Sequence, residues 1–359
     1  MKIVLLNTAR GWGGLESHSI ILAQSLLRLG HDVVLACRRE GNVGQEAAAA
    51  GIPTVHISMR NALDVYSVWQ IIYFVKQNKI DILIANLGKE YWPATVAAKL
   101  AGIKIVLFRH QLDPLKAMTK WLINTAVDKA IAVTHAVRTV MLQSGVQPEK
   151  VVVVHPGQDV ERFRTSGRFR ELIRSELGIK EHEVVIAYAG KLHPGKGIYE
   201  LLAAVHQVST AYPHIKLMYI GDGDDRGKLT KEAEIIGMAD KVILTGYRTD
   251  IDRLFSAMDI FALPSKGYES FGMVLIEAMA AGKAVIGTDT GGIPEIITHN
   301  VNGLLVSPGS VSELTQALAS LIGDAEWRRQ LADAGTQKID ANFTAAAAAL
   351  KVIDVVKAL

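Results

Sequence analysis

The chain has 359 residues, of which 49% are hydrophobic and 21% are charged, and its formal net charge is +3. This composition is typical of a folded globular enzyme and excludes a disordered or fibrous chain, while the length favours two domains. Cys37 is the only cysteine, which excludes an internal disulfide, so we expect a reducing, cytoplasmic setting. No apolar run approaches the roughly 20 residues that span a bilayer, and the chain starts with the pattern of a strand instead of a signal peptide.

The positive charge is concentrated in the first half of the chain. Residues 1–165 carry 19 Lys and Arg against 12 Asp and Glu, whereas residues 166–359 carry 20 against 24. A basic half suits an anionic lipid surface or a phosphorylated acceptor, although scattered surface charge is the simpler explanation. We expect no nucleic-acid partner, because the sequence has neither alternating basic and aromatic residues nor the spacing of zinc ligands.

Both halves open with the pattern of a β-α-β unit. In the first half, an apolar strand run at 2–6 is followed by a glycine-rich loop and a helix at 15–30. In the second half, a strand at 183–190 is followed by a similar loop and a helix at 198–212. Each helix leads to a further strand run, so the sequence predicts two Rossmann-like, doubly wound α/β domains facing each other across a cleft.

The boundary between these domains is expected where the chain turns polar and basic after the strand run that ends at His155. We therefore assign residues 1–165 to the first domain and residues 166–343 to the second. The tail from Thr344 has the spacing of an amphipathic helix.

The most informative stretch runs from Glu269 to Pro294. Glu269 precedes a predicted helix, and Glu277 lies inside that helix among apolar residues, where a buried carboxylate needs a partner. Along a helix the two acids would lie roughly 12 Å apart. Between them, the backbone N–H groups of the first turn offer a site for a diphosphate. The alternative is a partly exposed helix with two solvated acids.

The same stretch resembles the retaining glycosyltransferases of family 4, which have the GT-B fold. The shared pattern is Glu269 and Glu277 with seven residues between them, then GKAVIGT and GGIPE. The resemblance continues in GKLHPGKG at 190–197, IGDGDD at 220–225 and HPGQDVERF at 155–163, and it covers nearly the whole chain. It implies that the last helix, 344–359, crosses back to an N-terminal acceptor domain, and that 166–343 bind a nucleotide-sugar donor.

The resemblance also implies roles for five residues. Lys191 and Lys196 would neutralise the diphosphate leaving group, although the family normally has arginine at the first position and lysine loses its bidentate geometry. Glu269 would hold hydroxyls of the sugar, and Glu277 those of the ribose. His110, at the end of a strand run, would lie near the reaction centre. The alternatives without a function are that Lys191 and Lys196 are solvated loop lysines and that His110 is an ordinary histidine in the core or at its edge.

Further donor contacts are expected in the first glycine loop, after strands of the second domain and at the start of the helix. These candidates are Gly13, Gly14, Gly223, Tyr247, Arg248, Ser270, Phe271, Gly272, Met273 and Val274. We expect neither a metal nor a tightly bound cofactor, because the carboxylates at 222, 224 and 225 lack further ligands and the lysines supply positive charge.

Other functions remain open. A nucleotide-sugar epimerase or a phosphorylase would use the same GT-B fold, and a relative without catalysis would still bind nucleotide. The loop Gly11-x-Gly13 also begins like a nicotinamide-cofactor fingerprint, with Arg38 and Arg39 as readers of a 2′-phosphate. However, Glu16 stands at the third glycine position, which disfavours a dehydrogenase.

The acceptor is the least defined partner. Residues 109–127 mix Lys116, Lys120 and Trp121 with apolar residues, which suits a membrane surface or a lipid-linked acceptor, but also a helix packed inward. Bacterial relatives often build lipopolysaccharide or other surface glycans, so we expect such a pathway and a cytoplasmic protein that can be peripheral on the membrane. A small soluble sugar phosphate or cyclitol stays open as the acceptor.

Overall fold

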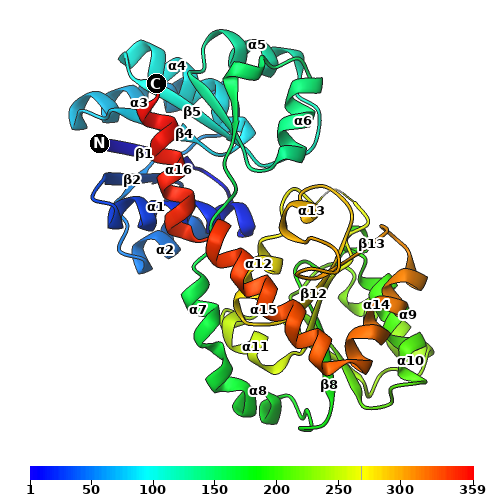
Figure 1. Cartoon of the computed structure of the whole chain (residues 1–359). Helices are drawn as coiled ribbons and strands as arrows, with labels where there is room; N and C mark the ends of the chain where they lie inside the picture. Colours follow the sequence, from blue (N-terminus) through cyan, green and yellow to red (C-terminus); the bar gives the residue numbers. More distant parts are fainter. Residues whose placement is uncertain (268) are drawn as a thin grey trace. The chain divides into compact units, whose positions relative to one another are not determined.

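A computed structural model of the chain describes residues 1–267 and 269–359 (Figure 1). The chain divides into two compact units. Unit 1 comprises Met1–Gln158 and Phe343–Leu359, and unit 2 comprises Asp159–Asn342.

Unit 1 is built on a seven-stranded parallel sheet with the order β3-β2-β1-β4-β5-β6-β7. Its strands are β1 (Lys2–Asn7), β2 (Asp32–Cys37), β3 (Thr54–His56), β4 (Ile82–Ala85), β5 (Lys104–Arg109), β6 (Lys129–Ala132) and β7 (Val151–Val153). Its helices are α1 (Gly14–Arg28), α2 (Asn42–Ala49), α3 (Val65–Asn78), α4 (Tyr91–Ala101), α5 (Ala117–Thr125), α6 (His135–Gln143) and α16 (Ala345–Lys357), with 3₁₀ turns η1 (Gly88–Glu90) and η2 (Pro148–Lys150). The strand order reverses between β1 and β4, which is where doubly wound sheets bind ligands.

Unit 2 has a six-stranded parallel sheet with the order β10-β9-β8-β11-β12-β13. Its strands are β8 (Val184–Ala189), β9 (Ile215–Ile220), β10 (Val242–Gly246), β11 (Ile260–Leu263), β12 (Ala284–Thr288) and β13 (Leu304–Val306). Its helices are α7 (Val160–Arg164), α8 (Arg170–Glu176), α9 (Ile198–Ser209), α10 (Arg226–Ile235), α11 (Ile251–Ala257), α12 (Met273–Ala280), α13 (Ile293–Ile296), α14 (Val311–Gly323) and α15 (Ala325–Asn342), with 3₁₀ turns η3 (Thr165–Phe169) and η4 (Pro194–Lys196). Here the order reverses between β8 and β11.

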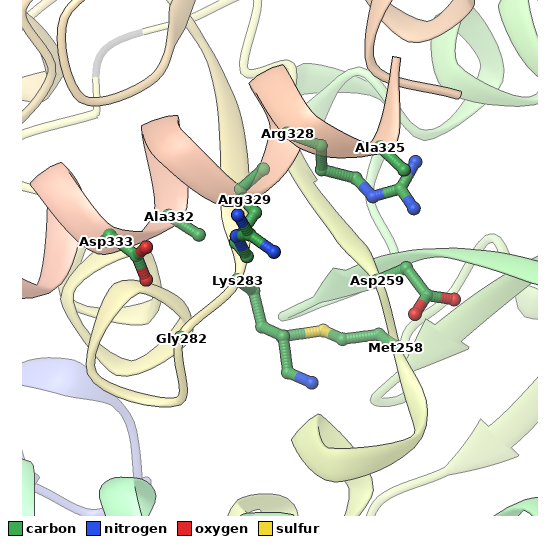
Figure 2. Close-up of a pocket in the computed structure, with 10 residues that line it drawn as sticks. Met258, Asp259, Gly282, Lys283, Ala325, Arg328, Arg329, Ala332 and Asp333 are labelled. Atoms are coloured by element: carbon green, nitrogen blue, oxygen red, sulfur yellow. The ribbon is translucent and has the colours of Figure 1, made fainter. Parts of the chain in front are cut away.

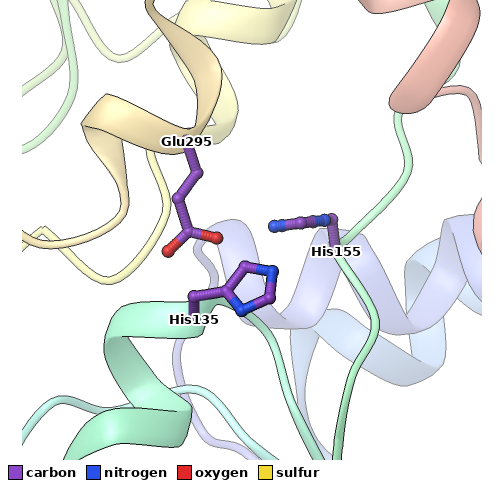
Figure 3. A group of neighbouring side chains, drawn as sticks. All are labelled: His135, His155 and Glu295. Carbon is purple, nitrogen blue, oxygen red and sulfur yellow. The ribbon is translucent and has the colours of Figure 1, made fainter.

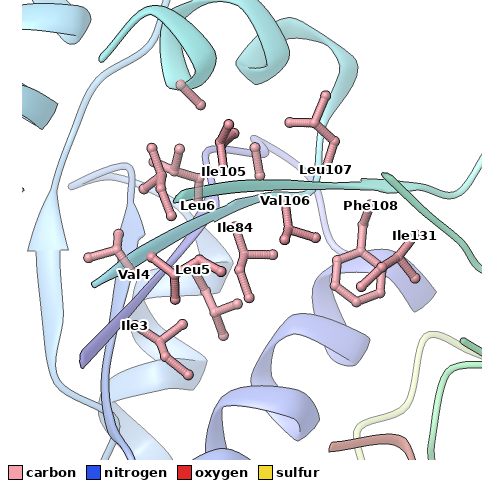
Figure 4. Close-up of a cluster of buried hydrophobic side chains, with 14 of the residues drawn as sticks. Ile3, Val4, Leu5, Leu6, Ile84, Ile105, Val106, Leu107, Phe108 and Ile131 are labelled. Carbon is pink, nitrogen blue, oxygen red and sulfur yellow. The ribbon is translucent and has the colours of Figure 1, made fainter. Parts of the chain in front are cut away.

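Continuous apolar strands explain why both sheets are parallel, because such sheets are covered by helices on both faces. Ile3, Leu5 and Leu6 of β1 are fully buried, and they belong to the same core cluster as Val106 and Phe108 of β5 (Figure 4). The predicted fold class, two Rossmann-like parallel α/β domains, is confirmed.

The last helix, α16, packs on α1 and completes the core of unit 1. Ala345 donates its backbone N–H to the carbonyl oxygen of Gln158 at 3.0 Å. A Cβ on Gly157 would lie 2.5 Å from the carbonyl oxygen of Thr344, so the close crossing of the two segments requires glycine. Ile353 is buried in the core. The return of this helix to the first domain is therefore also confirmed.

Candidate active site

An ion pair joins two loops at the carboxyl edge of the unit 2 sheet. Lys196, the last residue of η4, places its Nζ 2.6 Å from Oε2 of Glu269. The side chain of Lys196 is 36% exposed and that of Glu269 is 16% exposed, so solvent and a ligand can reach the pair. Ser265 directs its hydroxyl at the same carboxylate oxygen, 3.4 Å away. Two of the predicted site residues therefore lie in contact.

A glycine sets how closely these two loops approach. Gly197 has a φ of +72°, and a Cβ there would lie 1.9 Å from the carbonyl oxygen of Pro264, directly after β11. Lys266 donates its backbone N–H to the carbonyl oxygen of Gly195 at 2.9 Å, which ties the loops together. Any larger residue at position 197 would displace the backbone that carries Lys196.

The helix after Glu269 is α12, and one of its faces is only half-buried. It starts after Gly272, whose φ of +100° suits glycine, and most of its residues are buried. Met273, Val274 and Glu277 are the half-buried exceptions, and their spacing puts them on one face. Three of the predicted donor-binding residues therefore line the side of α12 that is not committed to the core.

The second predicted lysine has a looser environment. Lys191 is well exposed, and its Nζ lies 3.6 Å from the exposed carboxylate of Asp224. Its carbonyl oxygen accepts the hydroxyl of Tyr188 at 2.9 Å, so the backbone is fixed while the ammonium stays in solvent. A Cβ on Gly223 would lie 2.3 Å from the carbonyl oxygen of Leu192, so this glycine lets the loop after β9 pack against the loop of Lys191.

The segment after β10 contains an exposed tyrosine ring and an arginine whose guanidinium group is already hydrogen-bonded to carboxylates. Tyr247 is 66% exposed. Arg248 bonds to Asp250 and to Glu176, each at 2.7 Å, and these hydrogen bonds raise its pKa. The ring of Tyr247 is therefore accessible at this segment, whereas the side chain of Arg248 is engaged.

The carboxylates of the turn after β9 face separate partners. Asp222 lies 3.8 Å from Arg226, and Asp225 accepts the hydroxyl of Tyr199 at 3.0 Å. Burial and the bond to Asp225 raise the pKa of Tyr199 to about 12. With Asp224 beside Lys191, each carboxylate of this turn is directed at its own neighbour.

In unit 1, His110 directly follows β5, and its Nε2 is buried without a hydrogen-bond partner among the described residues. Its ring centroid lies 5.4 Å from that of His18 and 5.7 Å from that of Phe108. Burial, together with the charges of His18 and Arg109, holds the pKa of His110 well below its usual range. At neutral pH this imidazole is uncharged and can donate or accept a hydrogen bond.

Packing within unit 1 does not account for the glycines before α1. Gly13 has an extended φ of −174°, which any residue adopts, and a Cβ there would make only an ordinary 3.4 Å contact with Glu16. A Cβ on Gly11 would meet no atom of the described part of the chain within 4 Å. Gly14 is the first residue of α1. Larger residues would therefore fit at positions 11 and 13 as far as the packing of this loop is concerned.

Sequence reasoning missed a buried carboxylate at the β1–β4 reversal. Glu90 is fully buried, and it accepts the backbone N–H and hydroxyl of Thr8 at 2.6 and 2.8 Å. It also accepts the backbone N–H groups of Asn86 at 3.0 Å and Leu87 at 2.9 Å. Burial raises the pKa of Glu90, while these hydrogen bonds oppose that shift. The signal in the sequence was an acid directly before an apolar helix.

His18, on α1, was also given no role from the sequence. It is 3% exposed, and burial lowers its pKa to about 4. A different histidine pair lies after β6 and β7, where the rings of His135 and His155 are 5.9 Å apart and tilted by 58° (Figure 3).

A separate pocket of about 210 Å³ lies at the opposite, amino edge of the unit 2 sheet (Figure 2). Asp259 and Lys283, the residues just before β11 and β12, line it together with Arg328 and Arg329 of α15. Burial lowers the pKa of Lys283 to about 8. None of the predicted site residues lines this pocket.

Comparison with known proteins identifies the family. Residues 169–338 match the family described as glycosyl transferases group 1, and residues 12–162 match Glycosyltransferase Family 4. The chain belongs to the group 1 glycosyltransferases. The structure of this glycosyltransferase superposes on the crystal structure of Anabaena HepE in complex with UDP with a TM-score of 0.90, over 100% of both chains at 24% identity. That similarity establishes the GT-B fold.

Two curated relatives carry more specific names. D-inositol 3-phosphate glycosyltransferase of Segniliparus rotundus is 34% identical over 52% of this chain, but the match spans only 42% of that protein. Alpha-maltose-1-phosphate synthase of Mycolicibacterium smegmatis is 28% identical over 72% of this chain and 74% of its own length.

Proposed function

We propose that the chain moves a sugar from a nucleoside-diphosphate sugar to an acceptor hydroxyl, with retention at the anomeric carbon. The observation that carries the proposal is the contact of Lys196 with Glu269 at the sheet edge that precedes α12. An ammonium group there can stabilise the negative charge on the leaving diphosphate, and a carboxylate can accept hydrogen bonds from sugar hydroxyls. The name of the solved HepE complex, which contains UDP, favours a nucleoside diphosphate as one product.

The donor would lie along the half-buried face of α12 that carries Met273, Val274 and Glu277. Its diphosphate would meet the first turn of the helix, where Ser270, Phe271 and Gly272 precede Met273, and the helix dipole favours the negative charge. Glu277, on the same face, would accept the two ribose hydroxyls. The ring of Tyr247 and the backbone beside it would contact the base.

In the transfer step, the bond between the anomeric carbon and the phosphate oxygen breaks, and both electrons go to that oxygen. The acceptor oxygen bonds to the same face of the sugar, and the leaving phosphate takes the acceptor proton. Lys196 and Lys191 stabilise the charge on the phosphate. Glu269 orients the sugar and therefore differs in role from the paired acid and base of a glycosidase. A neutral His110 would hydrogen-bond at the sugar.

We further propose that the acceptor is a glycan or lipid-linked sugar of a bacterial cell-surface or lipopolysaccharide pathway, met at the cytoplasmic face of a membrane. The basic first half of the chain and the aromatic and lysine residues of α5 support this choice. The S. rotundus relative is named for an inositol phosphate acceptor, so a phosphorylated cyclitol is the alternative acceptor to test beside a glycan or lipid-linked sugar. We propose that no metal is needed.

The proposal is tested by measuring the melting temperature with UDP, GDP, ADP, NADPH and UDP-glucose, with magnesium or with EDTA. A nucleotide that binds the native state raises the melting temperature by mass action. We expect stabilisation by one nucleoside diphosphate and its sugar in both buffers. A response to NADPH alone would overturn the proposal, while donor isomerisation or phosphate-dependent release of the sugar would indicate an epimerase or a phosphorylase.

A further inference from the structure

One helical layer of unit 1 carries more than half of the large apolar side chains that are exposed in the described chain. The crossovers that contain α3, α4 and α5 all step in the same direction along the sheet, so the right-handed rule puts these helices on one face. We name the exposed apolar residues of this layer the aromatic face. They are Leu63, Val65, Tyr66, Trp69, Tyr73, Val96, Leu100, Met118 and Trp121.

The centre of the aromatic face is a row of rings on α3. Tyr66, Trp69 and Tyr73 are spaced three and four residues apart, so they lie on one side of the helix. They are 65%, 59% and 57% exposed, and successive ring centroids are 6.4 and 5.6 Å apart. Ile71 and Val75, on the other side, are buried in the core. The row is therefore not needed to fill the interior.

A second part of the aromatic face lies on α5. Met118 is 66% exposed and Trp121 is 58% exposed. The ring of Trp121 stacks on that of Trp92, at the start of α4, with centroids 6.0 Å apart. Because α4 also packs against α3, the apolar residues of α3 and α5 belong to one continuous layer.

Exposed lysine side chains flank the aromatic face at the end of α3 and at the start of α5. Lys76 and Lys79 at the end of α3, and Lys116 at the start of α5, are all exposed. The nearby Asp64 accepts the backbone N–H groups of Arg60 and Ser67, so its carboxylate is used as a helix cap. Unit 1 as a whole carries 19 Lys and Arg against 11 Asp and Glu. The face is thus both aromatic and cationic.

We propose that the aromatic face docks on an anionic phospholipid bilayer. Tyrosine and tryptophan favour the headgroup region because one part of each side chain is apolar and the other is polar, and lysines are attracted to acidic lipids. Among the described residues, every helix is too short or too polar to cross a bilayer, so this contact is with the surface. A second copy of the chain is a poorer occupant, since it would bring two cationic faces together.

This inference extends the proposed function by naming the partner of the acceptor-binding unit. Vesicle binding needs neither a donor nor sugar transfer. A protein that transfers sugar but does not bind vesicles would contradict only the docking surface. A protein that binds vesicles but not nucleotides would contradict only the proposed function.

The test is co-sedimentation of the full chain with vesicles of phosphatidylcholine alone or mixed with phosphatidylglycerol. We expect binding to the mixed vesicles that weakens as salt is added. Changing Tyr66, Trp69 and Tyr73 together to serine should weaken this binding on the order of tenfold or more. Replacing Lys76 and Lys116 by glutamine should weaken it and flatten its salt dependence.

A matched control replaces three exposed apolar residues of unit 2 by serine. Leu172, Ile235 and Val301 are 61%, 77% and 58% exposed, close to the values of the α3 row. This control should bind like the wild type, and melting temperatures should show that all variants fold. Equal binding by the α3 variant, equal binding to phosphatidylcholine alone, or no binding by the wild type would overturn the proposal. The proposal would also be overturned if gel filtration showed a dimer for the wild type and the control but a monomer for the α3 variant.

Discussion

The ammonium nitrogen of Lys196 lies 2.6 Å from a carboxylate oxygen of Glu269, although the two residues are 73 positions apart in the chain. The pair is partly exposed, so it contributes only ~0–1 kcal/mol to the free energy of unfolding. The close approach of Gly197 to Pro264, which holds the two loops together, is therefore better explained by ligand binding than by stability.

Replacing Lys196 by alanine should reduce kcat by on the order of a hundredfold, because the diphosphate would leave without its cation. The melting temperature should change little, because a partly exposed ion pair contributes little to stability. Steady-state turnover and thermal unfolding of the same preparation provide the two numbers.

Lys216 is a suitable control for this variant. It lies at the amino edge of the same sheet, with its Nζ 3.7 Å from the carboxylate of Glu183. Lys216→Ala should change stability by a similar amount and leave kcat intact. If Lys196→Ala loses turnover only in proportion to folded protein, Lys196 is structural.

Glu277→Ala should raise the Kd for the nucleoside diphosphate by about tenfold to a hundredfold, since two hydrogen bonds to a charged group would be lost. Isothermal titration of the variant and of Glu232→Ala, an exposed acid on α10, measures the difference. An unchanged Kd would remove the assignment of Glu277 to the ribose.

The two Rossmann-like domains could be predicted from the sequence because their signals are local. Buried strand runs such as that of β1, and loops whose glycines precede a helix, are properties of neighbouring residues. The end of the first domain is harder to locate: the sequence pattern places it at residue 165, in a polar and basic stretch, whereas unit 1 ends at Gln158. In the structure, Arg162 pairs with Asp252 at 2.7 Å and Phe163 packs on Phe255, so α7 lies in unit 2.

Part of the site could be predicted in the same way. Lys196 and Glu269 both follow strands of one parallel sheet, and carboxyl ends of such strands share an edge. The burial of His18 and the hydrogen-bond partners of Glu90 could not be predicted, because they depend on residues far away in the chain. Thr8, which binds Glu90, is 82 positions from it.

The stability of the protein should fall as pH falls from about 6.5 toward 4, through the titration of His18. Burial holds the pKa of His18 at about 4 in the folded chain, whereas the unfolded chain has the ordinary value near 6.5. Between these values the unfolded state binds more protons, so acid favours unfolding, by about 3 kcal/mol once both states are protonated.

Replacing His18 by phenylalanine should reduce this pH dependence, because phenylalanine fills a similar space beside Phe108 without titrating. His110, whose pKa is also lowered by burial, keeps its own contribution in this variant. The measurement is the urea midpoint of wild type and variant at pH 7 and pH 4.5. His206→Phe, at an exposed position of α9, should keep the wild-type slope. A variant with the slope of the wild type would show that other groups control acid unfolding.

Glu90→Gln is expected to destabilise the chain although it preserves shape. The carboxylate of Glu90 accepts four hydrogen bonds, two on each oxygen. The amide group of glutamine would therefore face N–H or O–H donors with hydrogens of its own, which should cost about 2–4 kcal/mol of unfolding free energy. Urea unfolding measures this loss, and Glu46→Gln on α2, which is exposed, should leave the midpoint unchanged.

Because Glu90 fixes the ends of β1 and β4 beside the loop of Gly11 and Gly13, the folded fraction should also bind substrate more weakly. Equal unfolding midpoints for wild type and Glu90→Gln would mean that the carboxylate is already protonated in the folded chain.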